Sequence, residues 1–188
     1  TKNKIDILCG STTKTLARSE LVDFTQLTFV TGASLMTLKR SNFSDLSSLN
    51  GKKIGVVKNT TTVKALNSLL KETLTDAKIV EVGSASDGLD KLRSGAIDAF
   101  SSDQVVLIGL ATTLNDVTNF VIASEVFSFE PFALAVRRND ADFRLVADRV
   151  ISHLYRTRQI LPIYQTYSAA LCIPPLNGGG DVLWPRTC

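Results

Sequence analysis

Short apolar, β-branched runs alternate along the chain with segments in which apolar residues recur every three or four positions. The first pattern is typical of buried strands and the second of amphipathic helices. The predicted strands are residues 5–9, 34–38, 53–57, 78–82, 97–101, 121–126 and 132–137. The predicted helices are residues 61–72, 86–94, 103–114 and 140–157, with a short further helix after Pro162. This alternation predicts an α/β fold with a mainly parallel sheet.

Two segments add detail to this prediction. The helix over residues 103–114 is apolar almost all round, so we expect it to be well buried. The chain opens directly on the strand over residues 5–9, so we expect its sheet to lack a preceding βα unit.

Composition limits the classes of partner. With 188 residues, 44% of them hydrophobic, the chain can bury a core as one ordinary domain or as two small lobes. The net charge of +3 comes from 21 basic and 18 acidic residues with no polybasic run, so nucleic acid is not an expected partner. No apolar run reaches the roughly 18 to 20 residues of a membrane span.

The cysteines and the single histidine show no metal-binding spacing, so neither a metal nor another cofactor is expected. Cys172 and Cys188 enclose a Pro- and Gly-rich tail, which a disulfide would tie down in an oxidising compartment; two free thiols are the equal alternative. Cys9 lies in an apolar run and is expected to be a buried small hydrophobic residue. His153 falls within a helical pattern and is interpreted as a partly exposed helix residue.

A hydroxyl-rich loop with an arginine follows the first strand. Residues 11–15 read Ser-Thr-Thr-Lys-Thr, and Arg18 comes three positions later. Hydroxyl groups and a planar guanidinium suit a carboxylate, which arginine can bind through two parallel hydrogen bonds. The alternative is a helix N-cap followed by a solvated arginine.

Two further polar segments follow predicted strands. Residues 58–62, Lys-Asn-Thr-Thr-Thr, precede a helix whose free amide groups and dipole favour an anion, although a capping turn explains the threonines equally well. Residues 101–103, Ser-Ser-Asp, end another strand, and Asp103 is placed either to hold an ammonium group or to cap the next helix. Together the three segments complement a zwitterionic amino acid.

Catalysis finds little support in the residues. The chain has no GxSxG nucleophile elbow, no cysteine in a recognisable frame with a histidine, and no carboxylate pair with a distinctive local context. We therefore do not expect an enzyme.

Several motifs resemble those of one protein family in the family's own order. These are the T-x-x-R-x-x-x-V-D-F core within residues 10–39, residues 46–62, the LRSGAIDAFSSD segment at residues 92–103, and residues 130–167. They are similar to the family 3 extracellular solute-binding proteins of polar amino-acid ABC transporters. The opening Cys-Gly-Ser-Thr-Thr at residues 9–13 looks most like the glutamate/aspartate-binding branch.

The resemblance implies the type II periplasmic-binding fold, in which two α/β lobes close on a ligand about a hinge. It assigns Ser11, Thr13 and Arg18 to the ligand α-carboxylate, Thr60 and Thr61 to ligand contacts from the second lobe, and Asp103 to the α-ammonium. Lobe one would comprise residues 1–38 and 131–188, and lobe two residues 39–130, with hinges in the crossing strands 34–38 and 132–137.

The chain departs from the family pattern in three ways. Asn59 stands where the family has glycine before the threonines, although asparagine also tolerates positive φ. The branch carries a longer N-terminal portion, so lobe one is expected to be incomplete and to expose a strand edge that favours self-association. The tail with Cys172 and Cys188 has no counterpart in the family pattern.

The resulting functional hypothesis is a periplasmic binding protein that delivers an amino acid, most simply glutamate or aspartate, to the membrane permease of an ABC transporter. Two alternatives stay open on the same scaffold: an amino-acid-sensing receptor domain and a dehydratase-like enzyme.

Overall fold

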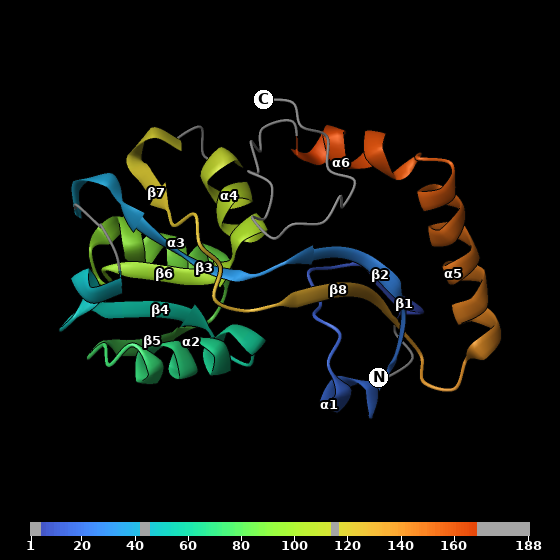
Figure 1. Ribbon diagram of the computed structural model, residues 1–188, viewed down its shortest axis with the longest axis horizontal. Helices are drawn as coiled ribbons and strands as arrows, with labels where there is room; N and C mark the ends of the chain where they lie inside the picture. Colours follow the sequence, from blue (N-terminus) through green and yellow to red (C-terminus); the bar gives the residue numbers. More distant parts are fainter. Residues whose placement is uncertain (1–4, 42–45, 114–116, 169–188) are drawn as a thin grey trace.

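The computed structural model describes residues 5–41, 46–113 and 117–168. In these ranges the chain forms two sheets that lie side by side, each accompanied by its own helices (Figure 1). We call the five-stranded sheet the large sheet and the three-stranded sheet the small sheet. The arrangement has the two-lobed α/β form expected from the sequence.

The large sheet has the strand order β5-β4-β6-β3-β7. Its strands are β3 (Ala33–Leu38), β4 (Lys53–Val57), β5 (Lys78–Val82), β6 (Ala99–Asp103) and β7 (Phe120–Ile122). β4 pairs in parallel with β5 and β6, and β3 pairs antiparallel with β6 and β7. The helices α2 (Thr61–Glu72) and α3 (Ala85–Ser94) supply the crossovers that the parallel pairs require.

The prediction of a mainly parallel sheet is wrong for the described strands. Only the two pairings of β4 are parallel, and both pairings of the small sheet are antiparallel. The reason is that β3 continues directly from the small sheet through Gly32, with no crossover helix before it.

Helices cover both faces of the large sheet, and alternate strand residues supply a core to each. On one face Leu35 and Ala99 pack with Leu66 of α2. On the other, their chain neighbours Met36 and Phe100 pack with residues of α3 and of α4 (Gln104–Thr113). Figure 1 shows α2 on one side of the sheet and α3 and α4 on the other. The short 3₁₀ helices at Lys39–Ser41, Leu46–Leu49 and Val117–Asn119 lie in connections.

The small sheet has the order β1-β8-β2 and is antiparallel throughout. Its strands are β1 (Ile7–Leu8), β2 (Asp23–Thr31) and β8 (Glu130–Val136). The four-residue helix α1 (Leu16–Ser19) separates β1 from β2. The helices α5 (Ala141–Arg156) and α6 (Ile160–Ser168) follow β8, and α5 runs along the outer side of this sheet (Figure 1).

The chain passes between the two sheets at two places that touch each other. β2 leads into β3 through Gly32, and the segment that ends at Ser128 returns to β8. A Cβ atom on Gly32 would lie 2.3 Å from the carbonyl oxygen of Ser128, so only glycine fits this close approach. The Ser128 hydroxyl in turn accepts a hydrogen bond from the Ala33 amide at 2.9 Å.

The expected lobe division, residues 1–38 with 131–188 and residues 39–130, stays a prediction. Strand pairing places β3 in the large sheet, so the first passage between sheets lies at Gly32. The segments expected as hinges, residues 34–38 and 132–137, fall mostly within paired strands next to the two passages.

Three expectations about single elements are corrected. Cys9 is exposed, because β1 ends at Leu8 and its outer face is open. α4 is only partly buried: its buried residues include Leu107 and Ala111, whereas Val105 and Ile108 keep partial exposure. The last helix begins at Ile160, so Pro162 lies in its first turn, where proline's missing amide costs nothing. Cys172 and Cys188 lie outside the described residues.

No helix within residues 5–41, 46–113 and 117–168 combines the length and apolarity needed to cross a bilayer. In the same part of the chain, no three histidine, cysteine or acidic side chains gather in a way that could hold a metal ion.

Candidate functional site

A buried carboxylate lies where the two sheets meet. Glu130, the first residue of β8, is 2% exposed. Its Oε2 atom accepts hydrogen bonds from Thr13 Oγ1 at 2.6 Å and from Thr61 Oγ1 at 2.8 Å. Its Oε1 atom accepts one from Ser128 Oγ at 2.7 Å. One carboxylate therefore joins the loop before α1, the start of α2 and the passage between the sheets.

Backbone bonds to β8 hold the hydroxyl-rich loop in place. The Lys14 amide donates to Pro131 O at 2.8 Å, and the Ala133 amide donates to Thr12 O at 3.2 Å. Thr13, between these two bonds, faces Phe132 in an isolated bridge and is buried. The loop therefore acts as a short extension of the small sheet.

Arg18 is fixed against this loop. Its Nη1 atom donates to Thr13 O at 2.8 Å, and its backbone amide donates to the Thr15 hydroxyl at 3.2 Å, which caps α1. Arg18 as a whole is partly exposed. The N-cap of the alternative interpretation is present at Thr15, but Arg18 is hydrogen-bonded to the loop and not freely solvated, and carboxylate binding stays a prediction.

The start of α2 presents its threonines differently from a capping turn. Thr60 occupies the N-cap position, but its hydroxyl donates to Val57 O at 2.7 Å and caps no helical amide. Asn59 has a φ of 62°, the left-handed conformation that the family's glycine would adopt there. Thr61 is partly exposed, with its hydroxyl on Glu130.

Asp103 ends β6 and is 9% exposed. Its Oδ1 atom is buried and has no hydrogen-bond partner. Burial first, and then the negative charge of Glu130, raise the pKa of Asp103 to about 6 against the opposing effect of the Arg18 guanidinium. A buried acceptor without a donor is costly unless a ligand supplies one.

Of the six residues expected to bind ligand, four form one group around Glu130. Thr13 and Thr61 contact it, Arg18 contacts Thr13, and Asp103 is coupled electrostatically to both Glu130 and Arg18. Two others lie at the margin: Ser11 is exposed in the turn before Thr13, and the Thr60 hydroxyl is turned toward its own strand. The ligand contacts of all six residues stay predictions.

Sequence reasoning missed Glu130. The only signal was an acidic residue immediately before Pro131 at the start of an apolar strand, inside a segment already used for the family resemblance. An acid at a strand terminus is ordinarily solvated. Its burial depends on the second passage between the sheets, which no local pattern reveals.

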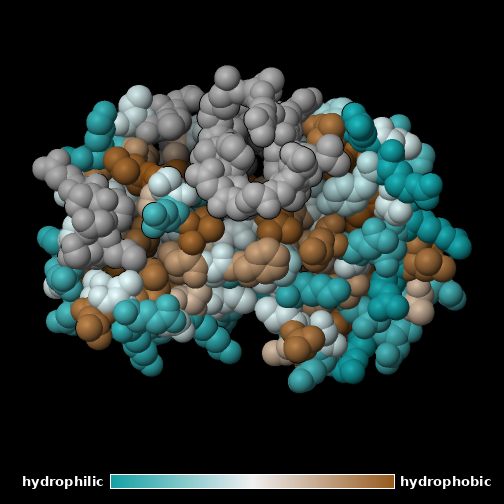
Figure 2. Space-filling view, viewed as in Figure 1, coloured by the Kyte–Doolittle hydropathy of each residue, from teal (hydrophilic) through white to brown (hydrophobic). Residues whose placement is uncertain are grey.

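The surface is hollowed near this group. Figure 2 shows a notch in the lower edge of the molecule, in the same view that places α1 on one side and α2 on the other in Figure 1. Thr13 lies just before α1, and Thr61 begins α2. The notch is therefore the outer opening of the space between the two sheets.

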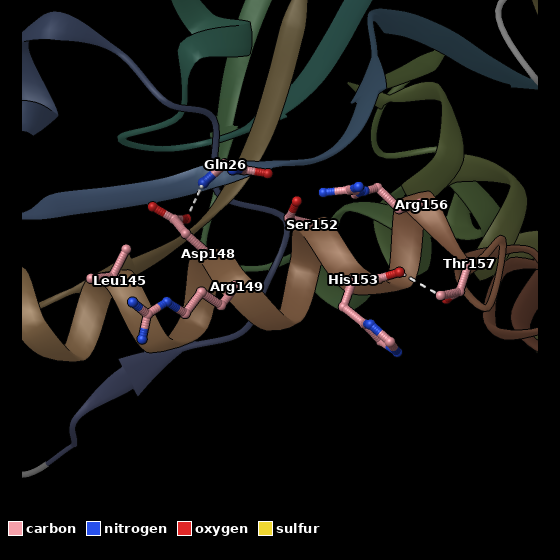
Figure 3. A pocket seen from close by; sticks show the side chains of 8 residues that line it. All are labelled: Gln26, Leu145, Asp148, Arg149, Ser152, His153, Arg156 and Thr157. Carbon is pink, nitrogen blue, oxygen red and sulfur yellow. Dashed lines mark hydrogen bonds between the residues drawn. The ribbon is translucent and has the colours of Figure 1, made fainter.

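Two other cavities lie away from this group. One, of about 640 Å³, is a groove between β2 and α5 lined by residues that include Gln26, Asp148 and His153 (Figure 3). Asp148 in this groove accepts a hydrogen bond from the Gln26 amide, and His153 is exposed, as its helical position predicted. The other, of about 350 Å³, lies against the opposite end of the large sheet and includes Thr37 and Asp98. Neither contains an expected ligand-binding residue.

Comparison with known proteins gives a consistent family assignment. The profile described as bacterial extracellular solute-binding proteins, family 3, matches residues 1–170. The chain is 29% identical to the L-glutamate/L-aspartate-binding protein of Pseudomonas aeruginosa, covering 87% of this chain and 54% of that protein. It is 31% identical to the glutamate/aspartate import solute-binding protein of Salmonella typhimurium, covering 78% and 49%. The chain thus spans about half the length of these curated relatives.

Solved structures show the same fold. An ancestral arginine-binding protein bound to arginine matches with a TM-score of 0.75 at 25% identity, covering 87% of this chain and 72% of that one. The ligand-binding core of GluR0 in complex with L-glutamate matches with a TM-score of 0.74 at 22% identity, covering 88% and 73%. These type II periplasmic amino-acid-binding structures confirm the expected fold class.

Proposed function

Because the chain belongs to the family 3 bacterial extracellular solute-binding proteins, we propose that it binds an amino acid between its lobes without transforming it. The observation that carries the proposal is Asp103, whose buried Oδ1 atom lacks a donor and whose pKa the charge of the Arg18 guanidinium acts to lower. An α-ammonium supplies the missing donor and an α-carboxylate suits the guanidinium. An amino acid carries both groups on one carbon atom.

The proposed contacts follow from the hydrogen bonds already made. The α-ammonium donates to Asp103, and the α-carboxylate binds Arg18 together with backbone N–H groups of the Thr13 loop. The Thr13 hydroxyl donates to Glu130, so it cannot also donate to the carboxylate. Ser11, Thr60 and Thr61 complete the pocket rim in this proposal.

We propose an acidic amino acid as the ligand, with delivery to a membrane ABC transporter from an extracytoplasmic compartment. The support is the naming of two similar relatives as glutamate/aspartate-binding proteins and the opening motif at residues 9–13. Other relatives are named for other amino acids, including a glutamine-binding protein of Bacillus subtilis at 28% identity. The side-chain preference therefore needs a direct measurement.

Calorimetric titration with glutamate, aspartate, glutamine and arginine tests the proposal. We expect saturable binding with one site per chain, strongest for glutamate or aspartate. Preference for glutamine or arginine would overturn the acidic assignment while leaving amino-acid binding intact. Absence of heat for all four, with the chain folded by circular dichroism, would contradict amino-acid binding.

Mass spectrometry of the same mixtures tests the non-enzymatic part of the proposal. One structural neighbour is described as an amino-acid-binding precursor of cyclohexadienyl dehydratase. We expect every amino acid to be recovered unchanged after prolonged incubation. Loss of water or ammonia from the ligand, in proportion to protein concentration, would show an enzyme.

A further inference from the structure

Glu130 contacts both sides of the space between the sheets at once. Thr13 belongs to the loop that extends the small sheet, and Thr61 begins a helix of the large sheet. Their hydroxyl groups meet at the same carboxylate oxygen, at 2.6 Å and 2.8 Å. The two threonines are 48 positions apart in the chain, from 13 to 61, so the arrangement of the two sheets brings them together.

The other carboxylate oxygen is held by the passages between the sheets. Glu130 Oε1 accepts from Ser128 Oγ at 2.7 Å, and Ser128 Oγ itself accepts from the Ala33 amide at 2.9 Å. Glu130 also pairs with Thr31 in the β2–β8 register. Oε1 thus anchors the carboxylate to both crossing segments. Oε2 accepts a hydrogen bond from one threonine on each side of the space between the sheets.

The two threonine hydroxyl groups are the donors in these bonds. A hydroxyl has a single hydrogen, and Thr13 and Thr61 each donate it to Oε2 of Glu130. Their remaining capacity is to accept. The two hydroxyl oxygens therefore keep lone pairs that can accept, as the unpartnered Asp103 Oδ1 atom can.

We infer that Glu130 is a positioning residue that couples the two lobes and presents Thr13 and Thr61 as acceptors to the ligand ammonium. The inference rests on the proposed function, since it assigns these threonines to the same amino acid. Separating the lobes breaks at least one of the two threonine bonds to Glu130, so these bonds favour closure before any ligand arrives. Ligand binding then starts from a partly organised site.

Affinity measurements on three variants test this role. Glu130→Ala removes both threonine bonds, and we expect amino-acid binding to weaken by about tenfold or more. Glu130→Gln keeps an accepting oxygen for the threonines and places an amide N–H toward Ser128, so affinity should stay within about threefold of the wild type. Glu125→Ala is the matched control, because Glu125 is an exposed acid on the same crossing segment, and it should bind as the wild type does.

Hydrogen exchange on the ligand-free chain tests the coupling independently of any ligand. We expect Glu130→Ala to speed exchange at residues 12–15 and 60–63 together, while the α2 core amides at Leu66 and Leu70 change little. Glu125→Ala and Glu130→Gln should leave both regions unchanged. A purely structural role would instead speed exchange throughout the chain in proportion to the lost stability.

The outcomes separate this inference from the proposed function. If the wild type binds an amino acid, and Glu130→Ala shows the same affinity and the same exchange rates, the inference is overturned. Amino-acid binding is then left intact. Absence of binding to the wild type would overturn the proposed function, and the exchange experiment would still decide whether Glu130 couples the lobes. Faster exchange on only one side of the space would also overturn the coupling.

Discussion

Among single residues, Asp103 has the environment least explained by folding alone. Its carboxylate is buried at the end of β6, one oxygen has no partner, and Glu130 adds a second negative charge nearby. Such a group lowers stability in the ligand-free protein and gains a partner when a cation binds. Its place in the chain therefore fits ligand binding better than capping of α4.

Asp103 gives the proposed binding a defined pH dependence. Burial raises its pKa to about 6 in the ligand-free protein, so the carboxyl is protonated below that pH and ionised above it. The α-ammonium binds the ionised form, so affinity should rise as pH increases through about 6 and level off above about 7. Asp103→Asn should weaken binding and flatten this profile in calorimetric titrations between about pH 5 and 8.

The raised pKa of Asp103 should also make folding stability depend on pH, in the direction opposite to that of ligand affinity. Because the folded pKa lies above the ordinary aspartate value of 3.8, ionisation costs more in the folded chain, and the ligand-free protein should lose stability as pH rises from about 4 to above 6. Asp103→Asn should remove this loss. A lowered melting temperature with unchanged affinity in Asp103→Asn would favour the capping alternative instead.

Ligand affinity should be sensitive to a substitution of Arg18 that keeps the positive charge. Arg18 Nη1 already donates to Thr13 O, which leaves other guanidinium N–H groups for a planar carboxylate. Lysine has a single ammonium and cannot make both contacts, so Arg18→Lys should weaken binding by at least about 2 kcal/mol. Arg149→Lys, on the exposed face of α5, is the control and should bind normally. Equal calorimetric affinity for both variants would contradict the role of Arg18.

The sequence predicted the charged and hydroxyl groups of the site better than the group that organises them. Arg18 and Asp103 follow strand ends in motifs that open α/β sheets use for ligands, and the structure brings them together. Glu130 could not be predicted, because its partners Thr13 and Thr61 come from both sheets. Ser11 fitted the motif equally well but is exposed, since the turn at Gly10 points it outward.

At the scale of elements, predictability follows the regularity of the pattern. α2 was predicted at residues 61–72, the bounds that it has, because its apolar residues recur on one face and Leu66 and Leu70 are buried. β2 was missed, since its register shifts between Phe24 and Phe29 disturb the two-residue alternation. β1 is shorter than the predicted residues 5–9 because it pairs only at Ile7 and Leu8.

The first passage between the sheets should tolerate no side chain. A Cβ atom at Gly32 would lie 2.3 Å from Ser128 O and 2.6 Å from Val126 Cβ. Gly32→Ala should therefore destabilise the chain by about 2 kcal/mol or more, as overpacking does. Gly109→Ala, where nothing lies within 4 Å, should instead stabilise α4 by up to about 1 kcal/mol. Chemical denaturation of both variants measures the difference, and equal stabilities would contradict the close approach.

At the scale of the whole molecule, the family motifs predicted the two-lobed fold, and the strand directions within it were the part that failed. The motifs lie in order along residues 10–167, and the family profile and solved structures agree with the fold that they imply. The antiparallel pairings of β3 and β8 could not be read from apolar runs, because such runs look alike in both directions. They arise from the two passages between the sheets.

The small sheet leaves apolar surface exposed on the described part of the chain. β1 pairs only with β8 and forms one edge of the sheet; Leu8 in β1 and Ile5 just before it are 45% and 58% exposed. On α5, Val146 and Val150 are 57% and 54% exposed. An open strand edge next to apolar side chains favours pairing with another chain.

We therefore expect the 188-residue chain to self-associate through the small sheet at rising concentration. Sedimentation velocity should show a concentration-dependent increase in mass, and Leu8→Lys should reduce it, because a charge on an edge strand opposes pairing. Leu74→Lys is the control: Leu74 is 90% exposed but lies after α2, away from the small sheet, so association should persist. Hydrogen exchange should be faster across the small sheet and α5, residues 5–31 and 130–156, than in the large sheet. A monomer with uniform protection in both regions would show that the small sheet is stable by itself and that its edge is harmless.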